Sequence, residues 1–156
     1  MRCIFLSPDD AGRLLSFYNR LSPEVTELYQ PFPVVSREVM STHLEETAAS
    51  KHISAALEEN GEICGHSFIL NLRDQHPVFG IGIEGRHHGA GWGRTLMKTV
   101  LERAVKDGIT TISLTVLKHN LRAQALYKSF GFEVVSDHTF RDENDSYFML
   151  RNTNPE

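Results

Sequence analysis

One glycine-rich stretch in the middle of the chain decides how the residues around it fold. Residues 87–97 are His87-His88-Gly89-Ala90-Gly91-Trp92-Gly93-Arg94-Thr95-Leu96-Met97, and they follow the apolar run Val78-Phe79-Gly80-Ile81-Gly82-Ile83. Glycines at every second position allow a tight turn and a close approach to the backbone, because they carry no Cβ atom. From Leu96 to Val105 the apolar residues recur with helical period. The stretch therefore predicts a strand, a turn and an amphipathic helix.

The start of this predicted helix is suited to an anion. Its first N–H groups have no partner within the helix and lie at the positive end of the helix dipole. We therefore expect the phosphate groups of an anionic cofactor here. Two nucleotide motifs fit poorly, since Gly93-Arg94-Thr95 is not the Gly-Lys-Ser/Thr of a P-loop and Arg94 stands where the Rossmann fingerprint needs glycine.

A second motif follows farther along the chain. Residues 109–116 are rich in β-branched side chains and predict a strand. Asn120 then predicts the start of a helix, as its N-cap, and Gly131 predicts the end of that helix. The apolar positions between them have helical spacing and are Ala123, Leu126, Tyr127 and Phe130.

The two motifs together define a family resemblance. Their pattern is Gly89-x-Gly91-x-Gly93-x-x-Leu96, then a strand, then Asn120-x-x-Ala123-x-x-Leu126-Tyr127-x-x-x-Gly131-Phe132. This closely resembles the GNAT superfamily of acyl-CoA-dependent N-acetyltransferases, in detail over residues 78–135. The resemblance implies one α/β domain over residues 1–156, with a mixed, mostly antiparallel sheet of about seven strands flanked by about four helices.

The resemblance also implies acetyl-CoA as the cofactor, because in that family backbone amides of the glycine loop bind the pyrophosphate of coenzyme A. Asn120 would contact the pantetheine arm, and Tyr127 would lie near the thioester sulfur. His88 stands where the family usually has Gln or Arg, which affects one side-chain contact but not the amides. The expected cofactor-binding residues are Ile81, Gly82, Ile83, His88, Gly89, Ala90, Gly91, Trp92, Gly93, Arg94, Asn120 and Tyr127.

Acetyl transfer to an amine needs a neutral nucleophile, a group that stabilises the oxyanion of a tetrahedral intermediate, and a proton for the departing thiolate. An alkylammonium with a pKa near 10.4 is neutral in only about one molecule in a few thousand at pH 7, so a base or a water chain is required. A backbone N–H within Ile81–Ile83 can meet the oxyanion. The phenol of Tyr127 can protonate the thiolate as the general acid.

The base is less well defined. Members of the resembled family often carry a glutamate on the strand before the glycine loop, but residues 78–83 contain none. Glu84, at the end of that strand, is the nearest carboxylate, and we expect it to be the second catalytic residue. His66, His76 and His87 are alternatives with suitable unperturbed pKa values. In each case water would relay the proton from the amine.

Composition excludes several other functions. With 156 residues, 40% of them hydrophobic and 23% charged, the chain is long enough for one globular domain with a core. A formal net charge of −4 gives no basic field, so we expect no nucleic-acid partner.

The sequence shows neither a signal peptide nor a membrane span, so we expect a cytoplasmic protein without a membrane partner. Cys3 and Cys64 form neither a disulfide framework nor a zinc site, and His87-His88 lack a third ligand, so we expect no metal.

The remaining segments predict the rest of the sheet. Asn60-Gly61 predicts a hairpin between strands at 52–57 and 63–70. Gly80 and Gly82 share one face of the strand at 78–83, which indicates either helix packing over glycine or room beside the cofactor. Further elements are expected as a strand at 2–6, helices beginning at Ser7, Ser22 and Ser36, and a closing strand pair at 133–140 and 146–150.

These observations favour an N-acetyltransferase that moves an acetyl group from acetyl-CoA to a primary amine of a small molecule, peptide or protein. The missing strand glutamate and the substitution at His88 leave a second function open, a catalytically degenerate acyl-CoA-binding module that acts as a sensor or partner protein. Many members of the resembled family are dimers, which implies that this chain can form a homodimer. Residues 23–49 carry no motif that identifies the acceptor amine.

Overall fold

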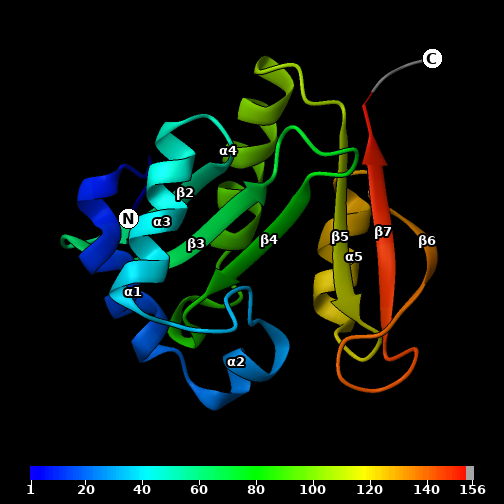
Figure 1. The fold of residues 1–156 in the computed structure, drawn as a ribbon. Coiled ribbons are helices and arrows are strands. Elements are labelled where there is room, and N and C mark those ends of the chain that lie inside the picture. The colour runs from blue at the N-terminus through cyan, green and yellow to red at the C-terminus, as the bar shows by residue number, and fades with distance from the viewer. Residues whose placement is uncertain (154–156) are drawn as a thin grey trace.

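A computed structural model describes residues 1–153, which form a seven-stranded sheet with helices on both faces (Figure 1). The strands are β1 (Arg2–Phe5), β2 (Ile53–Glu59), β3 (Glu62–Leu70), β4 (Val78–Ile83), β5 (Thr111–Leu117), β6 (Glu133–His138) and β7 (Ser146–Asn152). The α-helices are α1 (Ala11–Arg20), α2 (Pro23–Leu28), α3 (Arg37–Ala48), α4 (Trp92–Lys106) and α5 (Leu121–Ser129). Two short 3-10 helices are η1 (Pro8–Asp10) and η2 (Gly85–His87).

The strand order is β1-β2-β3-β4-β5-β7-β6, and β4 and β5 are the one parallel pair of neighbours among the described strands. The prediction of a mixed, mostly antiparallel α/β sheet is confirmed. The described residues contain five α-helices, one for each helix expected along the chain, where the resemblance implied about four. None of these helices is long and apolar enough to cross a membrane.

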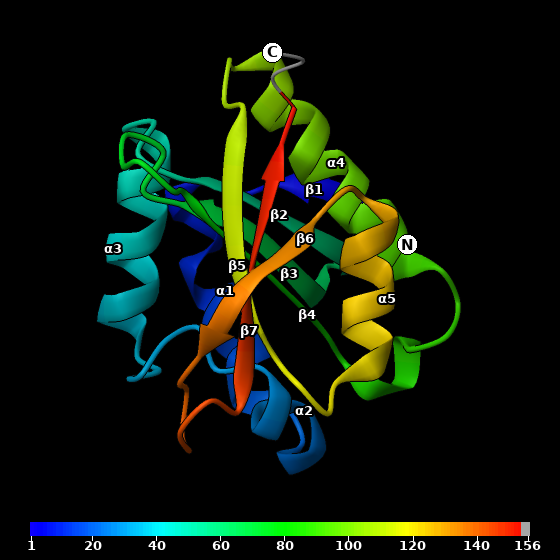
Figure 2. The same cartoon turned by 90° about the vertical axis from the view of Figure 1, so that its right-hand side faces the viewer.

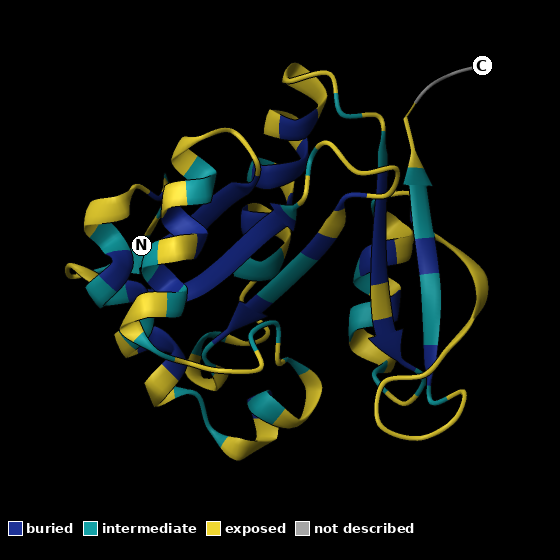
Figure 3. Cartoon of the chain, viewed as in Figure 1, coloured by how far each residue is buried: buried dark blue, intermediate teal, exposed yellow. Residues whose placement is uncertain are grey.

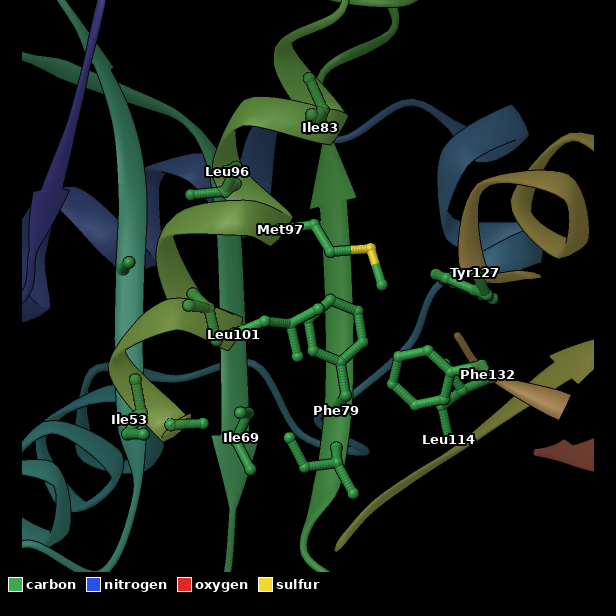
Figure 4. Packing of buried hydrophobic residues seen from close by; sticks show 14 of the residues in the cluster. Ile53, Ile69, Phe79, Ile83, Leu96, Met97, Leu101, Leu114, Tyr127 and Phe132 are labelled. Atoms are coloured by element: carbon green, nitrogen blue, oxygen red, sulfur yellow. The ribbon is translucent and has the colours of Figure 1, made fainter. Parts of the chain in front are cut away.

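Two hydrophobic clusters hold the helices against the sheet. Helices α1 and α3 cover one face of β1 to β3, and α4 and α5 lie on the other face (Figure 2). Leu96, Met97 and Leu101 of α4 pack against β3 and β4, where Phe79 lies beside them (Figure 4). The central strands are buried, whereas β6 is exposed along its whole length (Figure 3). Val105, expected on the apolar face of α4, is 52% exposed and lies outside the core.

The loops agree with the local sequence signals. Asn60 and Gly61 both have positive φ, 51° and 80°, as a two-residue hairpin turn of type I′ requires. Ser36 caps α3 by accepting a hydrogen bond from the Val39 N–H, and Asn120 caps α5 in the same way through the Ala123 N–H. Both cysteines are free thiols.

Strands β4 and β5 are joined at one end and diverge from there. The register contains a single pair between them, Val78 with Ser113, and the Ser113 N–H donates to the Pro77 carbonyl at 2.7 Å. Beyond this pair, the rest of β4 has no described partner on its β5 side. Figure 1 shows the two strands separating toward the lower end of the sheet.

The glycines of β4 make room for aromatic rings. A Cβ atom on Gly80 would lie 2.3 Å from Cζ of Phe68, and a Cβ atom on Gly82 would lie 2.1 Å from Cε2 of Tyr29. Gly80 is therefore covered by a ring from the neighbouring strand rather than by a helix, whereas the ring over Gly82 belongs to Tyr29, the C-cap residue of α2. The second reason, room beside the cofactor, stays a prediction.

We predict that Gly80→Ala lowers the free energy of unfolding by about 1–3 kcal/mol, because the buried Phe68 ring must move to admit the new methyl group. Urea denaturation measures the change. Gly85→Ala is the control, since a Cβ atom there would meet nothing within 4 Å and should change stability little. Equal stability of the two variants would contradict the packing described here.

Candidate active site

A groove of about 890 Å³ lies where β4 and β5 diverge. Its walls come from both strands, the glycine loop at residues 85–93, the first turns of α5, and α2 with the segment that follows it. Figure 2 shows the glycine loop on the α4 and α5 side of the sheet, and α2 on the other side.

The glycine loop presents bare backbone at the start of α4. Gly89 and Gly91 have left-handed backbone conformations, with φ of 82° and 84°, which favour glycine. Gly91 is the N-cap of α4, and no side-chain hydrogen bond caps this helix in the described structure. The first N–H groups of α4 are thus available to an anion.

Two arginines flank this loop. Arg94 lines the groove, donates to Ser129 Oγ at 3.0 Å and lies 5.2 Å from the ring centre of Phe130. Arg122 also lines the groove, and its Nη2 would lie 3.7 Å from a Cβ atom on Gly89. The sequence did not single out Arg122, although its place just after Asn120 was a usable signal. The bare amides and two guanidinium groups fit the diphosphate of coenzyme A.

Most residues predicted to bind the cofactor line the groove. They are Ile81, Gly82, Ile83, His88, Gly89, Gly91, Gly93, Arg94, Asn120 and Tyr127. Ala90 and Trp92 are not among the residues found to line it. The Trp92 side chain packs against the hydrophobic cluster under α4, so only backbone groups of these two residues remain as candidates for contact.

His88 ties the loop to the end of β4. Its Nε2–H donates to the Ile83 carbonyl at 2.8 Å, which places the ring proton on that nitrogen in the neutral form. The side chain that replaces the usual Gln or Arg of the resembled motif therefore contacts the protein's own backbone. This hydrogen bond joins the loop to the last residue of β4.

The open edge of β4 offers a backbone N–H for the oxyanion. The Glu84 N–H donates to the Cys64 carbonyl on β3. Because N–H groups alternate between the two sides of an antiparallel strand, those of Ile81 and Ile83 face the β5 side. That side is unpaired beyond Val78. Both residues line the groove, so either N–H is a candidate for the oxyanion.

Tyr127 enters the groove from α5. It is 8% exposed, and its ring packs edge-on against Phe79 and Phe132 with centroids 6.1 and 6.2 Å apart (Figure 4). Burial raises the pKa of Tyr127 to about 12. The phenol is therefore protonated at neutral pH, as a general acid must be before it donates.

The contacts of Glu84 argue against its expected role as the base. Its carboxylate accepts hydrogen bonds from Arg20 at 2.8 Å and from Arg86 at 2.9 Å. Burial raises its pKa, but the two arginines outweigh that effect and the net pKa lies below the usual value. Glu84 is also not among the residues found to line the groove. A carboxylate held charged by two arginines is a weak base.

The alternative histidines are placed differently from one another. His87 lines the groove, with Nε2 3.8 Å from Glu59 Oε1. His76 lies in the loop before β4 and packs edge-on against Phe148, away from the groove walls. His66 is fully buried on β3. No group of three or more His, Cys, Asp or Glu side chains that could hold a metal is found among residues 1–153.

The groove also contains a residue that sequence reasoning missed as functional. Tyr29, which follows α2, lies over Gly82 and lines the groove. Burial raises the pKa of Tyr29, and both Tyr29 and Tyr127 line the groove. Nothing in the local sequence around Tyr29 indicated this placement.

Comparison with known proteins gives the family of this chain. Residues 16–132 match the model of the acetyltransferase (GNAT) family, so the chain belongs to that family. It is accordingly an acetyl-CoA-dependent N-acetyltransferase.

The chain is also similar to particular named proteins and solved structures. The chain is 28% identical over 115 residues to the ribosomal protein bS18-alanine N-acetyltransferase of Escherichia coli K12, covering 71% of this chain and 78% of the relative. Among solved structures, a GNAT acetyltransferase of Streptococcus pneumoniae is 25% identical with a TM-score of 0.79, covering 97% of this chain and 98% of that chain. An acetyltransferase from Salmonella typhimurium with its cofactor acetyl-CoA has the same fold, with 19% identity, a TM-score of 0.82, and coverage of 100% of this chain and 95% of that chain.

We predict that Gly91→Ala weakens binding of coenzyme A by about tenfold, because a residue with a Cβ atom costs about 1–2 kcal/mol in the left-handed conformation and the loop rearranges. Isothermal titration calorimetry measures the affinity. The matched control is Gly61→Ala. Gly61 has a φ of 80° in the β2–β3 hairpin, so the same substitution causes the same backbone strain outside the groove. Unchanged affinity of Gly91→Ala would contradict a role for this loop in cofactor binding.

Proposed function

We propose that this acetyltransferase modifies the α-amino group at the N-terminus of a polypeptide. The charge distribution of the groove carries the proposal. Arg94 and Arg122 flank the glycine loop, whereas Glu24, on α2, is the carboxylate found among the groove-lining residues. An anionic cofactor at the loop and a cationic amine at the α2 end match this arrangement. The names of the curated relatives, which are alanine N-acetyltransferases of a ribosomal protein, favour the same acceptor class.

The groove offers candidate groups for cofactor binding, for stabilisation of the oxyanion and for protonation of the thiolate. Bound acetyl-CoA supplies an acetyl thioester. The N–H groups at the start of α4, with Arg94 and Arg122, hold the phosphate groups. The N–H of Ile81 or of Ile83 stabilises the negative charge that develops on the carbonyl oxygen as the amine attacks directly. Tyr127 donates its proton to the departing sulfur.

Release of coenzyme A thiol tests the proposed acceptor. A peptide that begins with alanine and contains an internal lysine should support release, and the same peptide with an acetylated N-terminus should not. Release with the blocked peptide, or with small amines alone, would overturn the proposed acceptor. Tight coenzyme A binding without release for any amine would indicate the acyl-CoA-binding module instead.

We predict that Tyr127→Phe lowers kcat by about 10²-fold or more, because removing a general acid costs about two to four orders of magnitude. The KM for acetyl-CoA should change little, since the ring remains in place. Steady-state kinetics measures both constants. Tyr147→Phe on β7 serves as the control, because that phenol lies under Lys118, 5.1 Å from its ring centre, and outside the groove walls. An equal kcat for Tyr127→Phe and the native enzyme would remove Tyr127 as the acid.

A further inference from the structure

Two exposed apolar side chains line the groove on its α2 side, where Glu24 lies. Leu28, the last residue of α2, is 43% exposed, and Phe140, in the loop between β6 and β7, is 45% exposed. Both line the groove. Figures 1 and 2 agree that this loop lies across from α2 at the lower end of the molecule. The two side chains therefore stand on the two sides of one opening, which we call the groove mouth.

The carboxylate of Asp145 holds the loop that presents Phe140. It accepts hydrogen bonds from three successive backbone N–H groups, those of Phe140 at 2.8 Å, Arg141 at 3.0 Å and Asp142 at 3.1 Å. The hydroxyl of Ser146, which also lines the groove, donates to the same carboxylate at 2.9 Å. One side chain thus fixes the backbone on which Phe140 stands.

These hydrogen bonds keep the Asp145 carboxylate charged. Burial raises its pKa, but the donated N–H and O–H groups outweigh that effect, and the net pKa lies well below the usual value. A charged acceptor binds amide donors more strongly than a neutral one does. The loop is therefore ordered before any acceptor arrives, and Phe140 loses little conformational freedom when it makes a contact.

The core does not account for either side chain of the groove mouth. Within residues 1–153, neither Leu28 nor Phe140 belongs to a hydrophobic cluster. The ring of Phe140 has the guanidinium carbon of Arg141 5.2 Å or less from its centre, at 4.9 Å. Single exposed apolar residues need no explanation, but exposed apolar residues that share one opening are typical of a binding surface.

A polypeptide acceptor reaches the groove mouth with its second residue. Tyr29 lies over Gly82, and the candidate N–H groups for the oxyanion belong to the residues on either side of that glycine, Ile81 and Ile83. The first residue of the acceptor therefore lies beside Tyr29. Leu28 precedes Tyr29 in the chain, and successive Cα atoms of a peptide are about 3.8 Å apart. The second residue then lies beside Leu28.

We propose that Leu28 and Phe140 select an apolar residue at the second position of the acceptor polypeptide. The inference rests on the proposed acetylation of a polypeptide N-terminus and specifies which sequences are acetylated. Leu28 and Phe140 touch the substrate, and Asp145 is a positioning residue that acts through Phe140. The guanidinium of Arg141, at the Phe140 ring, disfavours lysine or arginine at the same position, because like charges repel.

Three peptides that begin with alanine and differ only in the second residue, which is leucine, serine or lysine, test this selection. With the native enzyme saturated with acetyl-CoA, kcat/KM for the leucine peptide should exceed that for the serine peptide by about tenfold, the effect of roughly one methylene group in a hydrophobic pocket. The lysine peptide should be the poorest substrate. Equal kcat/KM values for the leucine and serine peptides would overturn the inference.

Substitution of the groove mouth tests the two contact residues. Phe140→Ala and Leu28→Ala should each reduce the ratio of kcat/KM between the leucine and serine peptides from about tenfold to about threefold or less. Phe5→Ala is the matched control and should keep the native ratio. Phe5 on β1 is 46% exposed, has the guanidinium carbon of Arg103 4.7 Å from its ring centre, and is not among the residues found to line the groove. A native ratio in Phe140→Ala would contradict the proposal.

Asp145→Ala tests the positioning role. Because it frees the loop without removing the Phe140 ring, it should raise the KM for the leucine peptide by more than the KM for the serine peptide, while kcat for both peptides falls by less than twofold. A merely structural role would lower kcat for both peptides by the same factor. That result would remove Asp145 from the account.

Isothermal titration calorimetry gives a readout that does not depend on turnover. The leucine peptide should bind the native enzyme saturated with coenzyme A about tenfold more tightly than the serine peptide, and equal affinities would overturn the selection. The two possible failures are distinguishable. A native enzyme that acetylates all three peptides equally keeps the proposed function and contradicts this inference, whereas a native enzyme that is inactive on every peptide contradicts both.

Discussion

The single pairing of Val78 with Ser113 is the constraint on which the site depends. Two parallel strands bridged at one end only can separate at the other, and the hydrophobic clusters on both faces keep each strand in place as they do so. The separation opens the groove and leaves the N–H groups of Ile81 and Ile83 without a strand partner. It also brings the start of α4 and the start of α5 to the same opening, since each helix is connected to one of the two strands.

Charge is arranged along the groove rather than spread over the molecule. Arginines flank the glycine loop, while many of the other groove-lining side chains are apolar, among them Phe79, Val116 and Leu126. Burial keeps Tyr127 protonated there, and Glu84, which stands at the end of β4, is neutralised by Arg20 and Arg86. The carboxylate nearest the glycine loop along the chain is therefore held in ion pairs rather than free to accept a proton.

The sequence predicted those parts of the site that depend on local backbone chemistry. Gly89 and Gly91 require positive φ, and Asn120 caps the helix that presents Tyr127, so these features follow from residues near each other in the chain. Residues brought together from distant segments were not predictable in this way. Arg20 lies 64 positions from Glu84, and Tyr18 lies 48 positions from His66. Whether a carboxylate is a base or half of an ion pair, and whether a buried histidine has partners, is decided by such tertiary contacts.

A crystal structure of the protein with coenzyme A tests the central claim most directly. The account predicts that diphosphate oxygens accept hydrogen bonds from backbone N–H groups at the start of α4, and that the pantetheine arm passes between β4 and β5 toward Tyr127. A diphosphate bound away from this helix start, or strands β4 and β5 paired along their length in the complex, would contradict it.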